Sequence, residues 1–272
     1  MKKNEPSAPK EAVFSNAADY HQTSSIQSKQ GRRLAMLLRH TLPEDFSPRW
    51  ISDLGCGSGK YTELIASLFP EARIVGADCS PEMLDLARRM LKGDRYSFVE
   101  CDLETADLSS TLGREKYDLV TSNAALHWIQ NQRRVYAGIH GSLVPGGWAA
   151  IHQGGRDSYK ELVQLAEALL RRGGLWEKHF TGFASPIHYI TVEELREIVL
   201  EVGFEIADLH MVSSHLAPRT IAVDFAQSAL LPYSKRIADP AEREAYEREF
   251  IDSAQKLDRI TINRLYFIGQ KQ

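Results

Sequence analysis

The sequence predicts an α/β protein built around a mostly parallel sheet. Three observations lead to this fold class. Short, largely apolar runs of strand length alternate with amphipathic stretches at helical spacing from residue 50 onward. A glycine-rich turn directly follows the first apolar run, and two further strand-like runs lie near the end of the chain. Strands that alternate with helices form right-handed βαβ units, which align the strands in parallel.

Seven segments have the length and apolar character of strands. Five of them alternate with helices. The other two come later than Trp148, where this regular alternation ends. The predicted strands cover residues 50–54, 73–78, 96–101, 117–122, 148–152, 204–212 and 261–268. About 45 residues separate the last two strands, which is more than a simple sheet connection needs.

Local signals place the helices between these strands. Ser80 precedes Pro81 in the pattern of an N-cap and first helical position. Thr191 stands three residues before Glu194, as in a capping box, and Pro145-Gly146-Gly147 predicts a turn. The predicted helices cover residues 13–38, 61–68, 81–91, 135–143, 159–171, 191–202 and a segment that begins at residue 240.

Composition excludes several classes of protein. The 272 residues include 33 Lys+Arg and 36 Asp+Glu, and the net charge of −3 leaves no electrostatic footprint for nucleic acid or an anionic membrane. No apolar run approaches the ~18–20 residues that cross a bilayer, and the polar N-terminus has no apolar segment typical of a secretory signal. The cysteines are Cys56, Cys79 and Cys101, too few for a disulfide framework, and no cluster has metal-ligand spacing. We therefore expect a cytoplasmic protein without a metal.

The most informative motif is Asp53-Leu54-Gly55-Cys56-Gly57-Ser58-Gly59, between the first strand and the first helix after it. Glycines at such a turn let a ligand approach the backbone closely. A dinucleotide fingerprint requires a third glycine at position 60, where this chain has Lys60. Asp53 is an unfavourable neighbour for a pyrophosphate and a good partner for an ammonium group.

Two more acids end the next two strands. Asp78 lies 23 residues after Gly55, where an acid can accept both hydroxyls of a ribose. Asp102 can accept from an exocyclic adenine amine, while Leu103 donates its backbone N–H to the ring. A ligand with an amine, a ribose and an adenine but no phosphate suits these three acids, and S-adenosylmethionine is such a ligand.

The motifs DLGCGSG, GADCSPEML, CDLE, YDLVTSNAALHWI and LVPGGW, in this order and spacing, resemble those of class I S-adenosylmethionine-dependent methyltransferases. The resemblance implies a Rossmann-like, seven-stranded, mostly parallel sheet with helices on both faces and a helical cap. It implies that Asp53, Gly55 and Gly57 hold the methionine moiety, and that Asn123 lies near it. The expected cofactor-binding residues are Tyr20, Asp53, Gly55, Cys56, Gly57, Asp78, Cys79, Met83, Asp102, Leu103 and Asn123.

The same resemblance predicts the organisation of the chain. We expect a disordered tail at residues 1–12 and an N-terminal helical lid at 13–45. The cofactor-binding core would cover 46–155. Residues 156–272 would complete the core and contribute cap insertions near 173–190 and 215–258.

Within the family, the segment Asn123-Ala124-Ala125-Leu126-His127-Trp128 is similar to small-molecule carboxyl methyltransferases. These act on trans-aconitate, malonyl-carrier protein or juvenile hormone acid. The N-terminal segment that contains Tyr20 and Gln27 is similar to the corresponding segment of the enzymes that act on malonyl-carrier protein and on juvenile hormone acid. This resemblance implies that Gln27 and Trp128 hold the carboxylate of a small acid acceptor.

Other functions stay open at this stage. Transfer to nitrogen, carbon or a phenol would need a base, and His127 is the candidate. An NAD(P) oxidoreductase is a hypothesis from another class, which Lys60 disfavours. A third hypothesis is a protein that binds the cofactor but has lost methyl transfer.

Overall fold

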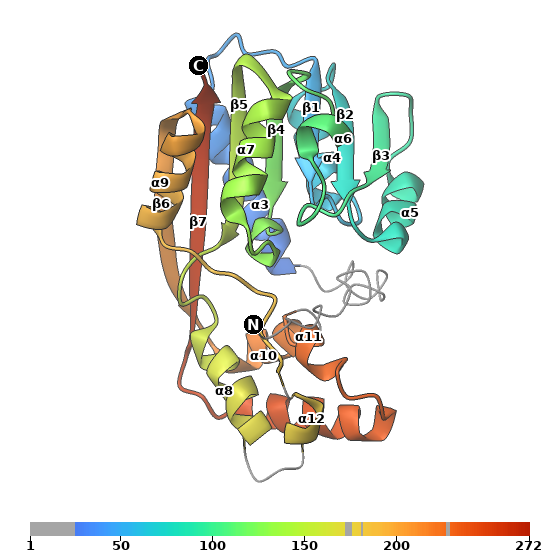
Figure 1. The fold of residues 1–272 in the computed structure, drawn as a ribbon, viewed down its shortest axis with the longest axis vertical. Helices are drawn as coiled ribbons and strands as arrows, with labels where there is room; N and C mark the ends of the chain where they lie inside the picture. Colours follow the sequence, from blue (N-terminus) through green and yellow to red (C-terminus); the bar gives the residue numbers. More distant parts are fainter. Residues whose placement is uncertain (1–24, 172–175, 181, 227–228) are drawn as a thin grey trace, which may run out of the picture.

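The computed structural model describes residues 25–171, 176–180, 182–226 and 229–272 (Figure 1). The predicted tail at 1–12, the first half of the predicted lid helix and Tyr20 lie outside the described residues. The backbone of Gln27 is described, whereas its side chain is not.

The described residues form one seven-stranded sheet in the order β3-β2-β1-β4-β5-β7-β6. β1 to β5 run parallel to one another, and β7 runs antiparallel to both β5 and β6. The predicted fold class is therefore confirmed. The strands are β1 (Trp50–Leu54), β2 (Arg73–Asp78), β3 (Tyr96–Glu100), β4 (Tyr117–Asn123), β5 (Leu143–Gly154), β6 (Phe204–Leu216) and β7 (Ile260–Lys271).

The last three strands are longer than the sequence predicts. The predicted turn Pro145-Gly146-Gly147 lies inside β5, where the register against β4 shifts and Gly146 has a φ of +78°. The glycines accommodate an irregularity within the strand, in the manner of a β-bulge. β6 and β7 pair with each other over their full length, so both extend past the apolar runs that predicted them.

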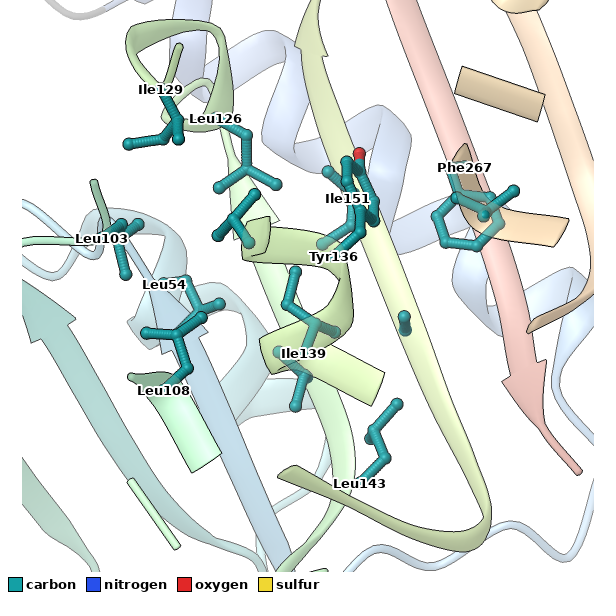
Figure 2. Close-up of a cluster of buried hydrophobic side chains, with 14 of the residues drawn as sticks. Leu54, Leu103, Leu108, Leu126, Ile129, Tyr136, Ile139, Leu143, Ile151 and Phe267 are labelled. Atoms are coloured by element: carbon teal, nitrogen blue, oxygen red, sulfur yellow. The ribbon is translucent and has the colours of Figure 1, made fainter. Parts of the chain in front are cut away.

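Helices cover both faces of the sheet. On one face, α3 (Ser25–Thr41) and α4 (Lys60–Leu68) bury Leu34, Leu38 and Ile65. On the other, α6 (Leu108–Thr111), α7 (Gln132–Ser142) and α9 (Val192–Val202) close a cluster that Figure 2 shows around Tyr136 and Ile139. Figure 1 shows α6 and α7 in front of the sheet and α3 behind it.

Helix caps follow the predicted signals. The Ser80 hydroxyl accepts from the Met83 N–H at 3.3 Å at the start of α5 (Pro81–Met90). At the start of α9, the Thr191 hydroxyl accepts from the Glu194 N–H at 3.1 Å, while the Glu194 carboxylate accepts from the Thr191 N–H at 2.6 Å. These bonds satisfy backbone donors that a helix start otherwise leaves unpaired.

A second group of helices lies beyond the ends of β1, β2 and β4 (Figure 1). They share a hydrophobic cluster that is separate from the two on the sheet and includes Trp176, Tyr246 and Phe250. The helices are α8 (Lys160–Arg171), α10 (Pro218–Ala226), α11 (Leu231–Ser234) and α12 (Pro240–Ala254). The sequence did not predict α6, α10 or α11.

Candidate active site

A cavity of about 690 Å³ opens at the carboxyl ends of β1, β2 and β4, beside the end of β3. This volume lies in the range of ~300–1,000 Å³ usual for small-molecule sites. Ser28, Gly31 and Arg32 of α3 form part of its wall. Of the residues predicted to bind cofactor or acceptor, those that line the cavity are Asp53, Gly55, Cys56, Gly57, Asp78, Cys79, Met83, Asp102, Leu103, Asn123 and Trp128.

The glycine turn shapes the cavity floor through backbone conformation. Gly55 has a φ of +67°, and a Cβ there would lie 2.2 Å from the Cβ of Ala125. Gly57 has a φ of +52°, and a Cβ there would meet no atom within 4 Å. Gly55 is therefore required for packing against the loop after β4, whereas Gly57 leaves open space through which a ligand can approach the backbone.

Asp53 is the most deeply buried acid of the cavity, with 1% of its surface exposed. The Thr62 hydroxyl donates to Oδ2 at 2.6 Å, and Oδ1 has no partner. Burial raises the pKa of Asp53 to about 7, and the nearby Asp78 adds to the effect. An unpartnered carboxylate oxygen at the wall of a cavity can accept a hydrogen bond from an ammonium group.

Asp78 is held by two backbone amides. The N–H of Gly57 donates to Oδ2 at 2.8 Å, and the N–H of Ser80 donates to Oδ1 at 2.9 Å. Burial raises the pKa of Asp78, and these N–H donors oppose the rise. Each oxygen keeps further lone-pair capacity, which is enough for the two hydroxyls of a ribose.

Asp102 organises the loop after β3. Its oxygens accept from the Glu104 N–H at 2.9 Å and from the Thr105 hydroxyl at 3.1 Å. The guanidinium of Arg134 donates to backbone carbonyls of the same loop, including Leu103 at 3.0 Å and Ala106 at 2.6 Å. Arg134 therefore fixes the loop that offers the Leu103 N–H. Sequence analysis missed Arg134, because no local pattern connects α7 to this loop.

Asn123 links the cavity to the next strand. Its Oδ1 lies 2.8 Å from Nδ1 of His152, and the N–H of Ala124 donates to the His152 carbonyl at 2.8 Å. On its other side, Gly31 packs so closely that a Cβ there would lie 3.1 Å from the Asn123 amide and 2.8 Å from Tyr61. Helix α3 is thus held tightly against the cavity wall.

His127 and Trp128 belong to the short 3-10 helix Leu126–Trp128, but only Trp128 lines the cavity. The Nδ1 atom of His127 accepts from the Gly154 N–H at 3.3 Å, and its ring stacks on Tyr189 with centroids 5.7 Å apart. Burial and, to a smaller extent, the charge of Arg264 lower the pKa of His127 to about 3. His127 is therefore a neutral imidazole with its accepting nitrogen engaged.

In the part of the chain that the structure describes, no group of three or more His, Cys, Asp and Glu side chains is arranged to hold a metal. No helix among those same residues has the length and apolar character needed to cross a membrane.

The sheet order and the acidic, glycine-lined cavity define a Rossmann-like protein with a site for an adenosyl ligand. A family model for a methyltransferase domain matches residues 52–149. The trans-aconitate 2-methyltransferase of Streptomyces coelicolor is 33% identical over 216 residues, which cover 77% of this chain and 69% of that protein.

A malonyl-[acyl-carrier protein] O-methyltransferase of Legionella pneumophila is 31% identical over 152 residues, which cover 56% of this chain and about half (51%) of that protein. Among solved structures, phosphoethanolamine N-methyltransferase 2 of Haemonchus contortus matches with a TM-score of 0.57 at 15% identity. The match covers 97% of this chain and 60% of that one, and it supports the fold alone. The chain belongs to the class I methyltransferases, and S-adenosylmethionine is its cofactor.

Proposed function

We propose that this enzyme transfers the methyl group of S-adenosylmethionine to a carboxylate oxygen of a small acid. The observation that supports this acceptor most is the state of His127. It is the base that the sequence offers, yet its pKa falls to about 3 and its Nδ1 accepts from a backbone N–H. A carboxylate is ionised at pH 7 and needs no base, whereas a phenol or an ammonium group must first lose a proton.

The cofactor, when bound, supplies a methyl group on a positively charged sulfur that leaves as a neutral thioether. Asp53 would hold the ammonium of the methionine moiety, and Gly55 and Gly57 would let that moiety lie against the backbone. Asp78 would accept the ribose hydroxyls, while Asp102 and Leu103 would recognise the adenine. The unpartnered Oδ1 of Asp53 and the open space at Gly57 both support this assignment.

Trp128 and Gln27 would position the acceptor. The indole N–H of Trp128 and the amide N–H of Gln27 are neutral donors that can orient a carboxylate and leave one oxygen free to attack. A Lys or Arg in this place would stabilise the ground-state charge that methylation consumes. Alignment of reacting atoms can contribute roughly 7–11 kcal/mol to the rate, so the protein needs no acid–base pair for this reaction.

The relatives support a carboxylate acceptor by their names, since both the Streptomyces and the Legionella protein are described as methyltransferases of acids. The Legionella protein acts on an acid attached to a carrier protein, and a free acid is our proposal for this chain. Membership of the methyltransferase family excludes the oxidoreductase hypothesis. Location in the cytoplasm stays a prediction.

The test is an acceptor screen with isotope-labelled S-adenosylmethionine. The panel contains free carboxylic acids, among them trans-aconitate, together with phenols, amines and malonyl-carrier protein. We expect a labelled methyl ester, which mild alkali cleaves, from at least one free acid. Labelled products that resist alkali and arise only from amines or phenols would contradict the proposal. Ester formation only on the carrier protein would contradict a free acid as the acceptor and leave carboxylate methylation intact.

A further inference from the structure

Arg264 is a buried charged residue that the roles above do not use. It lies on β7, opposite Gly154 of β5 and Val212 of β6, and 8% of its surface is exposed. Because β7 is antiparallel to β5, its first residues lie at the same edge of the sheet as the ends of β4 and β5. Arg264 therefore lies at the edge of the sheet that forms the cavity.

The partners of Arg264 are all neutral. One nitrogen, Nη1, donates to the Ser158 hydroxyl at 2.8 Å, the other, Nη2, donates to the Tyr159 hydroxyl at 2.6 Å, and Nε has no partner. The guanidinium also lies over the Tyr159 ring, 4.9 Å from its centroid. Among the described residues, no carboxylate forms an ion pair with it. A buried charge without a counter-ion is costly, and buried charges in proteins are usually paired, so an anionic ligand would lower the cost at Arg264.

The groups around Arg264 add no negative charge. His152 is fully buried, its Nε2 has no partner, and burial followed by the charge of Arg264 lowers its pKa well below the ordinary value. The same two causes keep His127 neutral. The region between the ends of β5 and β7 thus has one permanent positive charge and two neutral imidazoles.

Two series of contacts connect this region to the cavity. Asn123 lines the cavity, and its Oδ1 lies 2.8 Å from Nδ1 of His152. The His152 ring lies 4.9 Å from the ring of Tyr266, centroid to centroid, and Tyr266 is two residues along β7 from Arg264. Trp128 also lines the cavity, and its ring lies 5.8 Å from that of His127. His127 in turn accepts from Gly154, the residue that pairs with Arg264. Arg264 therefore lies just beyond the wall where the acceptor would be held.

We propose that Arg264 binds a second, non-reacting anionic group of the acceptor, so that the preferred substrate is a dicarboxylic or tricarboxylic acid. This inference rests on the proposed function and specifies its substrate class. The reacting carboxylate stays with the neutral donors, because a cation there would oppose methylation, while a cation on a remote carboxylate provides binding energy that positions the reacting one. The fork of a guanidinium matches a carboxylate through two parallel hydrogen bonds.

The alternative is that Arg264 only ties the segment around Ser158 to β7. That structural role predicts that removal of Arg264 lowers stability and affects all acids equally. Recognition of a second carboxylate predicts instead that the loss is selective for acids with more than one carboxylate. The two interpretations therefore differ in specificity.

The test is calorimetric binding of acids to the full-length protein with saturating S-adenosylhomocysteine. The probes are dicarboxylic and tricarboxylic acids of about four to six carbons, including trans-aconitate, each paired with the monocarboxylic acid of the same skeleton. We expect wild-type protein to bind at least one polycarboxylate about 100-fold more tightly than its monocarboxylate counterpart, and Arg264→Gln to abolish this preference. Arg264→Lys retains the charge without the fork and should lose about tenfold.

Arg156→Gln is the matched control. Arg156 lies near the same edge, but its guanidinium is exposed and already paired with Glu194 at 2.8 Å. This variant should bind every probe as the wild type does. The melting temperature and the S-adenosylhomocysteine affinity of each variant report on folding. If Arg264→Gln does not fold, the polycarboxylate preference of Arg264→Lys, compared with that of the wild type, tests the assignment.

Three outcomes would overturn the Arg264 assignment: wild-type protein without any preference for a polycarboxylate, an Arg264→Gln or Arg264→Lys variant with the full wild-type preference, or an equal loss for all acids. Ester formation is measured separately with the same probes. Binding of a polycarboxylate through Arg264 without any methyl ester would contradict the proposed function and leave the Arg264 assignment intact.

Discussion

The two halves of the active site are built in different ways. The proposed cofactor half consists of residues in or directly after the last positions of β1, β2 and β3, at their carboxyl ends, and each lies in a short contiguous motif. The proposed acceptor half combines Trp128 after β4 with His152 near the end of β5 and Arg264 on β7, which are far apart in the sequence. A parallel sheet brings the carboxyl ends of successive strands together, so a cofactor site there can be recognised from short sequence motifs. The acceptor site depends instead on how segments that are distant in the sequence pack together.

This difference predicts that changes in the cofactor half act on fold and cofactor affinity, while changes in the acceptor half act on turnover.

The largest expected effect is at Gly55. Gly55→Ala would force a positive φ on alanine and drive its Cβ against Ala125. We expect a loss of about 2–5 kcal/mol in the free energy of unfolding, measured with urea. Gly57→Ala shares the positive φ without the clash and should cost about 1–2 kcal/mol. Equal losses in the two variants would contradict this account of the turn.

The next effect concerns cofactor affinity. Asp78→Ala removes the proposed acceptor of the ribose hydroxyls, and each lost hydrogen bond to a charged group costs ~1.5–3 kcal/mol. Calorimetry should show the dissociation constant of S-adenosylmethionine rising tenfold or more. Glu100→Gln is the control, because Glu100 lies opposite Asp78 on β3, is exposed and does not line the cavity. Unchanged affinity in Asp78→Ala would refute the ribose assignment.

A smaller effect is expected in the acceptor half. Trp128→Phe retains the ring and removes the indole N–H, so kcat/KM for the acid should fall roughly tenfold or more. Gln27→Leu should act in the same direction. Cofactor affinity and melting temperature should hardly change in either variant. Trp50→Phe is the control, since Trp50 lies at the start of β1, away from the cavity. Full turnover in both acceptor variants would show that these side chains do not hold the substrate.

The last expected effect is a pH dependence of cofactor binding. The pKa of Asp53 is raised from 3.8 to about 7 in the folded protein. The folded state therefore binds a proton more readily than the unfolded state, and this contribution to stability is present below pH 3.8 and is lost as pH rises toward 7. An ammonium partner favours the carboxylate form, so cofactor affinity should fall by up to about tenfold per pH unit below 7. Asp53→Asn should bind weakly and independently of pH, and an affinity in the wild type that does not change between pH 5 and 8 would exclude this role.

Sequence analysis predicted the sheet and many of the residues that line the cavity. Strands β1 and β2 have the predicted bounds, and the caps at Ser80 and Thr191 form as expected, because these features depend on residues close together in the chain. The lengths of β6 and β7 depend on their mutual pairing over twelve positions, which a single strand does not reveal.

Residues that come together only through packing between distant segments could not be predicted to the same extent. Arg134 acts on a loop about thirty residues earlier, and His152 meets Asn123 only because β4 and β5 are neighbours. Arg264 did give a signal, since a charged residue inside an otherwise apolar strand near the cavity edge is unusual. That signal becomes specific only when the order of strands places it beside His152 and Gly154.

The most direct test of the central claim is the pH dependence of kcat at saturating cofactor, compared between wild type and His127→Gln. If the acceptor is a carboxylate that needs no base, kcat should be nearly constant from about pH 7 to 9. His127→Gln should then stay within about threefold of the wild type, far from the ~100-fold loss expected when a general base is removed. A kcat that rises tenfold per pH unit and collapses in His127→Gln would contradict the account and favour an acceptor that must be deprotonated.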